Sequence, residues 1–395
     1  MLRDREPLMS DKDFGLDELP DLHELLAELR THGSVVPVKF WGNTIWLIMG
    51  HPEVKQAFGD VVSFDGGAFF MEYAAPAMGR NIQSMQGDEH RAKRALVAPS
   101  FMPGKVRALV EHTLEPIIHE LLDRIEGKEE VEFTQAFTRP FPFSIITRML
   151  GIPVHDEAKF LKWAVKLIDY GWDPEGSLQA KKEFDDYMDD IIRQRRAEPK
   201  DDMISMIVTA EVGGEHLSHE EILAFLRLLF PAGSDTTYKA GGSLFACVLA
   251  DPAFRAMAQQ DDKARTALVA EALRWQPPVA LEPRMASADI ELGGVSIKEG
   301  DMVALAITAA NRDPAVFPDG SRFDPTRDNS KSLTFAYGPH FCLGMHLARR
   351  ELEAALRIVF ERFPNMQLSP DRPVEFVGGV LRGPRELWVR PYGAK

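Results

Sequence analysis

The longest helical pattern in the chain runs from Leu217 to Ala250. Apolar side chains recur there at helical spacing, Ser218 with Glu221 three residues later predicts a capping box at the start, and Asp251-Pro252 predicts the end. Pro231 lacks the N–H that a helix interior needs, so we expect a kink or a widening in the middle of this segment. The pattern therefore predicts a long, kinked central helix.

Shorter patterns predict strands towards both ends of the chain. Alternating side chains indicate two strands from Val35 to Met49 around a turn at Gly42-Asn43, further strands from Asp289 to Ile307, and a closing hairpin from Val374 to Val389. A short amphipathic helix is expected from Leu22 to Leu29. These elements predict a mixed α and β chain that is predominantly α-helical, with a smaller β-rich lobe.

The segment from Gly66 to Gly79 is apolar but interrupted by glycine and proline, which is typical of a mobile loop. It carries Phe69, Phe70, Met71 and Met78. Two interpretations stay open, because these side chains either line a pocket or pack the loop against the rest of the protein.

Composition narrows the classes of protein to which the chain can belong. The 395 residues, 45% hydrophobic and 27% charged, contain no Ser/Gly linker and no internal repeat, so we expect a single domain over residues 1–395. A net charge of −14 argues against a nucleic-acid partner. The first twenty residues hold no apolar run that would form a signal peptide or membrane anchor, and two cysteines make a disulfide framework unexpected. We therefore expect a cytoplasmic monomer that contacts no membrane.

Cys342 is the residue with the clearest chemical signal. A helix is predicted to begin just beyond Gly344 and to end at Pro364, so its amino end faces the cysteine. Unpaired N–H groups and the positive end of the helix dipole favour a thiolate there, so we expect this thiol to ionise more easily than a free one and to bind a metal. The alternative is that Cys342 is a small buried hydrophobic residue, as we expect for Cys247.

The residues around Cys342 favour the interpretation that this cysteine is a metal ligand. Phe335, Gly338, His340, Cys342 and Gly344 stand as F-x-x-G-x-H-x-C-x-G, which resembles the haem-binding loop of the cytochrome P-450 family of haem-thiolate monooxygenases. The resemblance implies the cytochrome P-450 fold, with haem b as cofactor and Cys342 as the axial ligand of its iron. The family usually has glycine or serine at the position of Ala336, so the local loop geometry is expected to differ here.

Three further motifs agree with this family. A-G-S-D-T-T at 232–237 resembles its oxygen-binding motif, which implies that Thr236 and Asp235 deliver protons. On the residues alone, the more common arrangement is that the hydroxyl of Thr236 bonds to the turn at Ala232 while Asp235 faces solvent. The E-x-x-R spacing of Glu271 and Arg274, together with Arg322 in the motif R-F, resembles the buried Glu-Arg-Arg cluster of the family, which is structural.

The resemblance also implies how the haem and the substrate are held. Haem propionates would be bound by the H-x-x-x-R pair His90 and Arg94, by Arg284 and by His340. The substrate pocket is expected to include Phe69, Phe70, Ala232, Gly233, Val279 and Leu281.

The implied activity is insertion of one oxygen atom from O2 into a small hydrophobic organic substrate. No flavin or reductase module is recognisable, so electrons from NAD(P)H are expected through a separate two-iron ferredoxin and an NAD(P)H-dependent ferredoxin reductase. Arg349 and Arg350, joined by Lys93 and Lys105, are expected to dock the ferredoxin. A peroxide-driven haem-thiolate peroxygenase and a non-enzymatic haem sensor remain alternatives, although neither needs the pair Asp235-Thr236.

Overall fold

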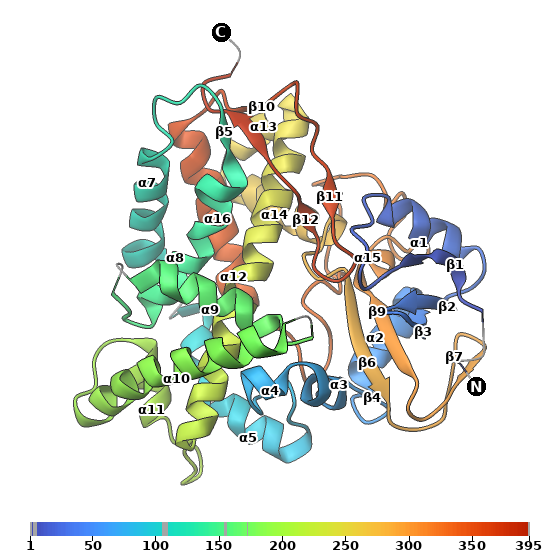
Figure 1. The fold of residues 1–395 in the computed structure, drawn as a ribbon. Coiled ribbons are helices and arrows are strands. Elements are labelled where there is room, and N and C mark those ends of the chain that lie inside the picture. Colours follow the sequence, from blue (N-terminus) through green and yellow to red (C-terminus); the bar gives the residue numbers. More distant parts are fainter. Residues whose placement is uncertain (1, 3–5, 105–109, 154–155, 172, 394–395) are drawn as a thin grey trace.

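The computed structural model describes residues 2, 6–104, 110–153, 156–171 and 173–393 and has a helix-rich part beside a smaller part that contains the main sheet (Figure 1). The α-helices are α1 (Leu22–Arg30), α2 (His51–Gly59), α3 (Gly66–Tyr73), α4 (Ala75–Met78), α5 (Gly87–Val97), α7 (Glu115–Asp123), α8 (Pro140–Met149), α9 (Glu157–Ile168), α10 (Pro174–Ala197), α11 (Met203–Thr209), α12 (His219–Ala250), α13 (Pro252–Ala258), α14 (Asp262–Trp275), α15 (Ile307–Ala310) and α16 (Met345–Arg362). A 3-10 helix, η2 (Ala98–Phe101), and two π-helical turns, η3 (Val110–Leu114) and η4 (Thr134–Thr138), connect some of them. The predicted fold class, mixed and mainly helical, is confirmed.

Helix α12 is the centre of the helix-rich part. Ser218 and Glu221 form the predicted capping box, and Asp251 ends the helix. The helix continues through Pro231 without a break in its secondary structure, and the kink or widening at this proline stays a prediction. Two hydroxyls next to the proline, on Ser234 and Thr236, donate to the carbonyls of the preceding turn.

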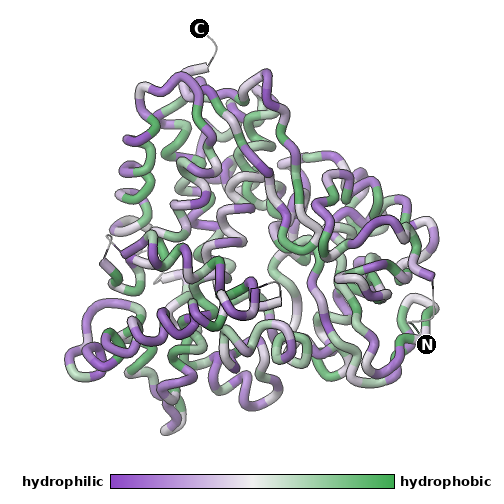
Figure 2. The backbone as a smooth tube through the Cα atoms, viewed as in Figure 1, coloured by the Kyte–Doolittle hydropathy of each residue, from purple (hydrophilic) through white to green (hydrophobic). Residues whose placement is uncertain are grey.

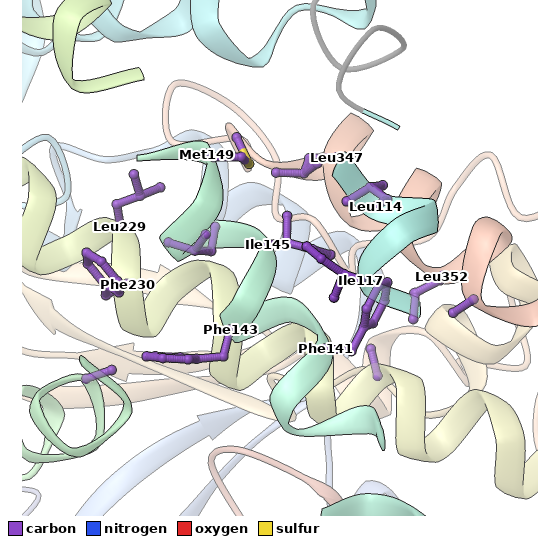
Figure 3. Close-up of a cluster of buried hydrophobic side chains, with 14 of the residues drawn as sticks. Leu114, Ile117, Phe141, Phe143, Ile145, Met149, Leu229, Phe230, Leu347 and Leu352 are labelled. Carbon is purple, nitrogen blue, oxygen red and sulfur yellow. The ribbon is translucent and has the colours of Figure 1, made fainter. Parts of the chain in front are cut away.

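The largest hydrophobic core lies between α12 and the helices around it. In Figure 3, side chains of α7 and α8 point towards α12 on one side and towards α16 on the other. Leu347 and Leu352, both buried, bring α16 into this core. The helix that follows Cys342 is thereby fixed against the middle of the protein, while hydrophilic positions dominate outer segments such as α10 (Figure 2).

The main sheet has six strands in the order β1-β2-β3-β9-β6-β4. Its strands are β1 (Leu8–Asp13), β2 (Val35–Phe40), β3 (Asn43–Ile48), β4 (Phe64–Asp65), β6 (Leu281–Ala286) and β9 (Met302–Ala306). Phe40 pairs with Asn43, so the hairpin turn is Trp41-Gly42, one residue earlier than predicted, and both residues have positive φ. Strand β6, which carries Arg284, pairs antiparallel with β9.

Smaller sheets complete the fold. Strands β7 (Ile290–Leu292) and β8 (Val295–Ile297) form a hairpin, and β11 (Phe376–Val377) pairs with β12 (Gly383–Pro384). The last predicted strand, β13 (Trp388–Arg390), joins β5 (Val131–Glu132) and β10 (Gln367–Leu368) instead of extending the closing hairpin. No helix in the part of the chain that the structure describes is both long and apolar enough to span a bilayer.

The segment from Gly66 to Gly79 differs from the prediction. It forms helices α3 and α4, whereas the sequence suggested a loop. The side chain of Asp65 caps α3 by accepting from the N–H of Ala68, which the glycine-rich start of the segment did not reveal.

Candidate functional site

The Cys342 loop is closed by its own main chain. The N–H of Cys342 donates to the carbonyl of Phe335 at 3.0 Å, and the N–H of Phe341 donates to Gly338 at 3.1 Å. Gly338 has φ +81°, and a Cβ there would lie 3.0 Å from the carbonyl of Phe58, so this position requires glycine. Ala336, where the family usually has glycine or serine, has φ +62°, a conformation that residues with a side chain rarely adopt.

Two opposing influences act on the thiol of Cys342. Burial raises its pKa, whereas the N–H groups of Gly344 and Met345 and the charge of Arg94 lower it. The net shift is upward, so the expectation of an easily ionised thiol is wrong for the protein chain alone. The residue still exposes surface, and a Cβ on Gly344 would meet no atom within 4 Å, so space for a flat ligand is present beside the cysteine.

Four basic side chains gather next to this loop. We call His90, Arg94, Arg284 and His340 the basic cluster. The rings of His90 and His340 are 4.2 Å apart, and Arg94 donates to the carbonyl of Phe341 at 2.5 Å, which ties α5 to the Cys342 loop. Within the described part of the protein, Arg284 forms an ion pair with Glu282, with Nη1 and Oε1 2.9 Å apart.

The electrostatics of the basic cluster favour a bound anion. Burial, then the nearby His90, Arg284 and Arg94, lower the pKa of His340 to about 4. Burial and Arg94 likewise lower the pKa of His90, whose buried Nε2 has no partner within the described part of the protein. Carboxylates placed here would satisfy this nitrogen and offset the repulsion, so the cluster fits the propionates of a haem.

Asp235 and Thr236 lie on α12, and their contacts differ. The hydroxyl of Thr236 donates to the carbonyl of Ala232 at 2.8 Å, the bond that the residues alone allowed. Asp235 lines a cavity of about 20 Å³ together with Arg139, Tyr238 and residues of α9. Burial raises the pKa of Asp235, while Lys239 and Arg139 act against it.

Three of the expected pocket residues make contacts within the protein, and their role in a pocket stays a prediction. Leu281 is fully buried in the core beneath the sheet, because alternate positions of β6 face that core. A Cβ on Gly233 would lie 2.8 Å from Ile146, so this glycine packs against α8. Phe69 stacks on Trp41 and Tyr73, with ring centroids 5.7 and 4.7 Å away.

The other expected pocket residues have different exposures. Ala232 is exposed, Val279 is half-buried, and Phe70 is buried in the helical core. A pocket role for Ala232, Val279 and Phe69 stays a prediction.

The predicted buried Glu-Arg-Arg cluster is present, but its second arginine is a different residue from the one predicted. Arg274 donates to both carboxylate oxygens of Glu271, at 2.8 and 2.6 Å, and both side chains are inaccessible to solvent. The third arginine is Arg327, whose Nε lies 3.7 Å from Glu271. Arg322 is exposed and contributes its main-chain carbonyl to Arg274 at 3.2 Å, so the assignment of its side chain to the cluster is wrong.

The predicted docking residues are only partly available. Arg349 is exposed and lies over the ring of Phe335, 5.2 Å from its centroid, whereas Arg350 pairs with Glu353 at 2.8 Å. Lys93 is mostly buried and pairs with Glu221 at 3.0 Å, so it does not join an exposed patch. Lys105 lies outside the described residues.

The sequence analysis did not single out Glu351, although the helical pattern contained a signal. It lies one helical turn from Leu347 and from Ala355, on the apolar side of α16, where a carboxylate is unexpected. The side chain is buried, its Oε1 is unpartnered among the described residues, and burial raises its pKa to about 8 against the opposing hydrogen bond of Thr237.

Comparison with known proteins places the chain in a family. The family model "Cytochrome P-450" matches residues 16–386. The chain is 32% identical to 6-deoxyerythronolide B hydroxylase of Saccharopolyspora erythraea, over 89% of this chain and 91% of that protein, and 31% identical to mycinamicin IV hydroxylase/epoxidase of Micromonospora griseorubida, over 88% and 90%. The solved structure of the bacillaene polyketide synthase cytochrome P-450 PksS of Bacillus subtilis superposes with a TM-score of 0.87, at 30% identity, over 94% of this chain and 97% of that one. The chain therefore belongs to the cytochrome P-450 family of haem-thiolate monooxygenases.

Proposed function

We propose that this monooxygenase inserts one oxygen atom from O2 into a C–H bond of a hydrophobic organic substrate, with Cys342 as the thiolate ligand of haem b. The basic cluster beside Cys342 carries the proposal. It supplies the cations Arg94 and Arg284, and His90 Nε2, which lacks a partner in the described part of the chain, would lie where propionates are expected. His90, Arg94, Arg284 and His340 would hold those carboxylates, and the N–H groups of Gly344 and Met345 would stabilise the thiolate.

When bound, a haem with a thiolate ligand supplies the iron that activates dioxygen with two electrons and two protons. The protein must then supply protons while it keeps bulk water away.

Thr236 and Asp235 are suited to two different tasks, in which Thr236 holds the ligand and Asp235 supplies protons. Because the hydroxyl hydrogen of Thr236 is used by Ala232, the lone pairs of its oxygen remain to accept a hydrogen bond from a protonated ligand in the pocket. Asp235, whose pKa is raised by burial, keeps a proton more readily than an exposed aspartate does. The cavity beside it, about 20 Å³, has room for one water molecule, which would reload Asp235 from the side of Arg139.

The substrate class rests on the relatives. The named hydroxylases act, by their names, on 6-deoxyerythronolide B and mycinamicin IV, and PksS belongs to polyketide biosynthesis. We propose a hydrophobic secondary metabolite of this kind for the present chain. Electrons would come from NAD(P)H through a two-iron ferredoxin and its reductase, docking near Arg349.

The test is the yield of oxygenated product per NAD(P)H consumed, measured with ferredoxin, reductase and isotopically labelled O2. We expect label in the product of wild type, and a several-fold lower yield in Thr236→Ala with haem content unchanged, because the ligand loses its acceptor. Thr326→Ala, on an exposed segment, is the matched control. No label in the product under labelled O2, together with full turnover on hydrogen peroxide alone, would favour a peroxygenase. Haem binding without turnover of any substrate would favour a sensor.

A further inference from the structure

Asp235 and Lys239 lie one helical turn apart on α12, but they do not form an ion pair in the described part of the protein. An acidic residue four positions before a lysine is the favourable order for an ion pair on a helix. On α10, Lys182 and Asp186 have the reverse order and are exposed, and still their Nζ and Oδ2 lie 2.7 Å apart. The side chain of Lys239 must therefore be held by another group.

The group that holds Lys239 is the side chain of Tyr238. The ammonium Nζ of Lys239 donates to the phenolic oxygen at 3.0 Å and lies 4.9 Å from the centroid of the ring. The aliphatic stem of the lysine is confined as well, because a Cβ on Gly383 of β12 would lie 3.0 Å from Lys239 Cβ and 3.1 Å from its Cγ. Tyr238 and β12 together keep the ammonium group outside ion-pair distance of Asp235.

A second cation, Arg139, lies beside the same tyrosine. Its guanidinium carbon is 6.0 Å from the ring centroid of Tyr238, and its Nη1 is 3.5 Å from the amide oxygen of Gln135. Arg139, Tyr238 and Asp235 line the cavity of about 20 Å³, which has room for one water molecule. Tyr238 thus lies next to both cations and faces the same cavity as Asp235.

The position of the two cations matters for the proton on Asp235. Burial raises the pKa of Asp235, Lys239 and Arg139 lower it, and the carboxylate of Asp169 at the end of α9 raises it. A cation in direct contact with a carboxylate holds it in the ionised form. Because neither cation reaches ion-pair distance among the described residues, burial remains the larger influence and Asp235 can keep a proton.

We propose that Tyr238 is a positioning residue for proton supply, which holds Lys239 away from Asp235 so that Asp235 can take up a proton from the cavity and pass it on. The inference rests on the proposed function, because it concerns the proton donor of that reaction. The proton comes from water, is held on a carboxylate oxygen of Asp235 and leaves towards the ligand held by Thr236. Without the phenolic oxygen of Tyr238, the ammonium group is free to pair with the carboxylate one turn before it.

Tyr238→Phe tests the proposal, because it removes the phenolic oxygen and keeps the ring. The carbon-13 signal of the Asp235 carboxyl, assigned by its loss in Asp235→Asn, is titrated in the reduced holoprotein with carbon monoxide bound. We expect a lower pKa of Asp235 in Tyr238→Phe than in wild type. An aspartate with a lower pKa loses its proton at a lower pH, so the yield of product per NAD(P)H should fall several-fold in alkaline buffer and less in acid buffer.

Lys239→Met tests whether the lysine causes this defect. Alone, it should raise the pKa of Asp235 and move the alkaline loss of product yield to higher pH. Combined with Tyr238→Phe, it should relieve the defect and behave like Lys239→Met alone. The matched control combines Tyr238→Phe with Lys182→Met, which removes a lysine of the exposed pair on α10 and should leave the full defect in place.

Two results would overturn the proposal. One is a pKa of Asp235 that is the same in Tyr238→Phe and wild type, and the other is a defect that Lys239→Met does not relieve. Haem content and the carbon monoxide band identify a Tyr238→Phe protein that has failed to fold. Lys239→Met alone then decides, since an unchanged pKa would show that the lysine does not act on Asp235. Failure of the proposed function is a separate result, because wild type would then lack the thiolate band or the labelled product.

Discussion

The buried ion cluster and the basic cluster both contain several charged groups, but they differ in how these charges are satisfied. The carboxylate of Glu271 accepts two hydrogen bonds from Arg274 and one from the N–H of Asp324. The charge of Arg327 lies 3.7 Å away, and its buried Nε has no hydrogen-bond partner among the described residues. In the basic cluster, His90 Nε2 has no hydrogen-bond partner among the described residues. Charges that satisfy one another stabilise the fold, whereas charges that need an external partner indicate where a ligand binds.

The largest expected effect is at the ion cluster. Glu271→Gln should lower the free energy of unfolding by about 3–5 kcal/mol, because it leaves Arg274 buried without a counter-charge. Urea unfolding measures this, with the exposed pair member Asp186→Asn as control, for which we expect less than about 1 kcal/mol. Arg327→Gln should destabilise more than Arg322→Gln, and the reverse order would contradict the assignment of Arg327.

Glu351 gives the stability of the protein a pH dependence. The pKa of Glu351 is about 8 in the folded chain and ordinary when unfolded, so the folded state binds the proton more tightly. Its contribution to stability is therefore present at low pH and is lost as the pH rises from about 4.5 to about 8, by at most about 1.4 kcal/mol per unit.

Glu351→Gln should remove this slope. Unfolding of the haem-free protein at several pH values, compared with Glu353→Gln on the same helix, measures the difference. Parallel curves for wild type and Glu351→Gln would show that Glu351 is ionised in the folded chain.

Removal of His90 should separate ligand binding from folding. His90→Phe should weaken haem retention about tenfold, the effect of losing one charge-assisted hydrogen bond. The stability of the haem-free protein should be equal or higher, because a buried unpartnered nitrogen is removed. The rate of haem transfer to apomyoglobin measures haem retention. His119→Phe, on the exposed side of α7, is the control. Equal haem transfer rates would exclude His90 from the site.

The smallest effect concerns the ferredoxin. Arg349→Glu should slow first-electron transfer a few-fold at low salt, and the difference should fade as the Debye length drops below about 10 Å. Arg350→Glu should act less, since Arg350 already pairs with Glu353. Stopped-flow reduction at two ionic strengths measures both. Rates that respond to neither substitution would locate docking on another face.

The sequence predicted best where a residue's role depends on its immediate neighbours. The capping box of α12, the helix after Gly344 and the pair Glu271–Arg274 are all local, and each is present. Predictions that needed a side chain's direction did worse. Arg327 replaces Arg322 because the irregular segment between them turns one side chain inward and the other out, and such a segment has no periodicity to read.

The burial of individual side chains could also not be predicted from the sequence. The helix end beside Cys342 favours a thiolate, as expected, but the surrounding protein opposes it more strongly. Side chains alternate between the two faces of β6, and the register of β6 with β9 decides that Leu281 is on the face that packs against the core. Both outcomes depend on segments far apart in the chain.

The central claim is that Cys342 and the basic cluster form one haem-thiolate site. Addition of carbon monoxide to the reduced protein tests it most directly. We expect the strongly red-shifted Soret band typical of thiolate ligation in wild type, its loss in Cys342→Ala, and its retention in Cys247→Ala, whose cysteine is buried in α12. An unshifted, histidine-like band in wild type, or a shifted band that survives in Cys342→Ala, would contradict the account.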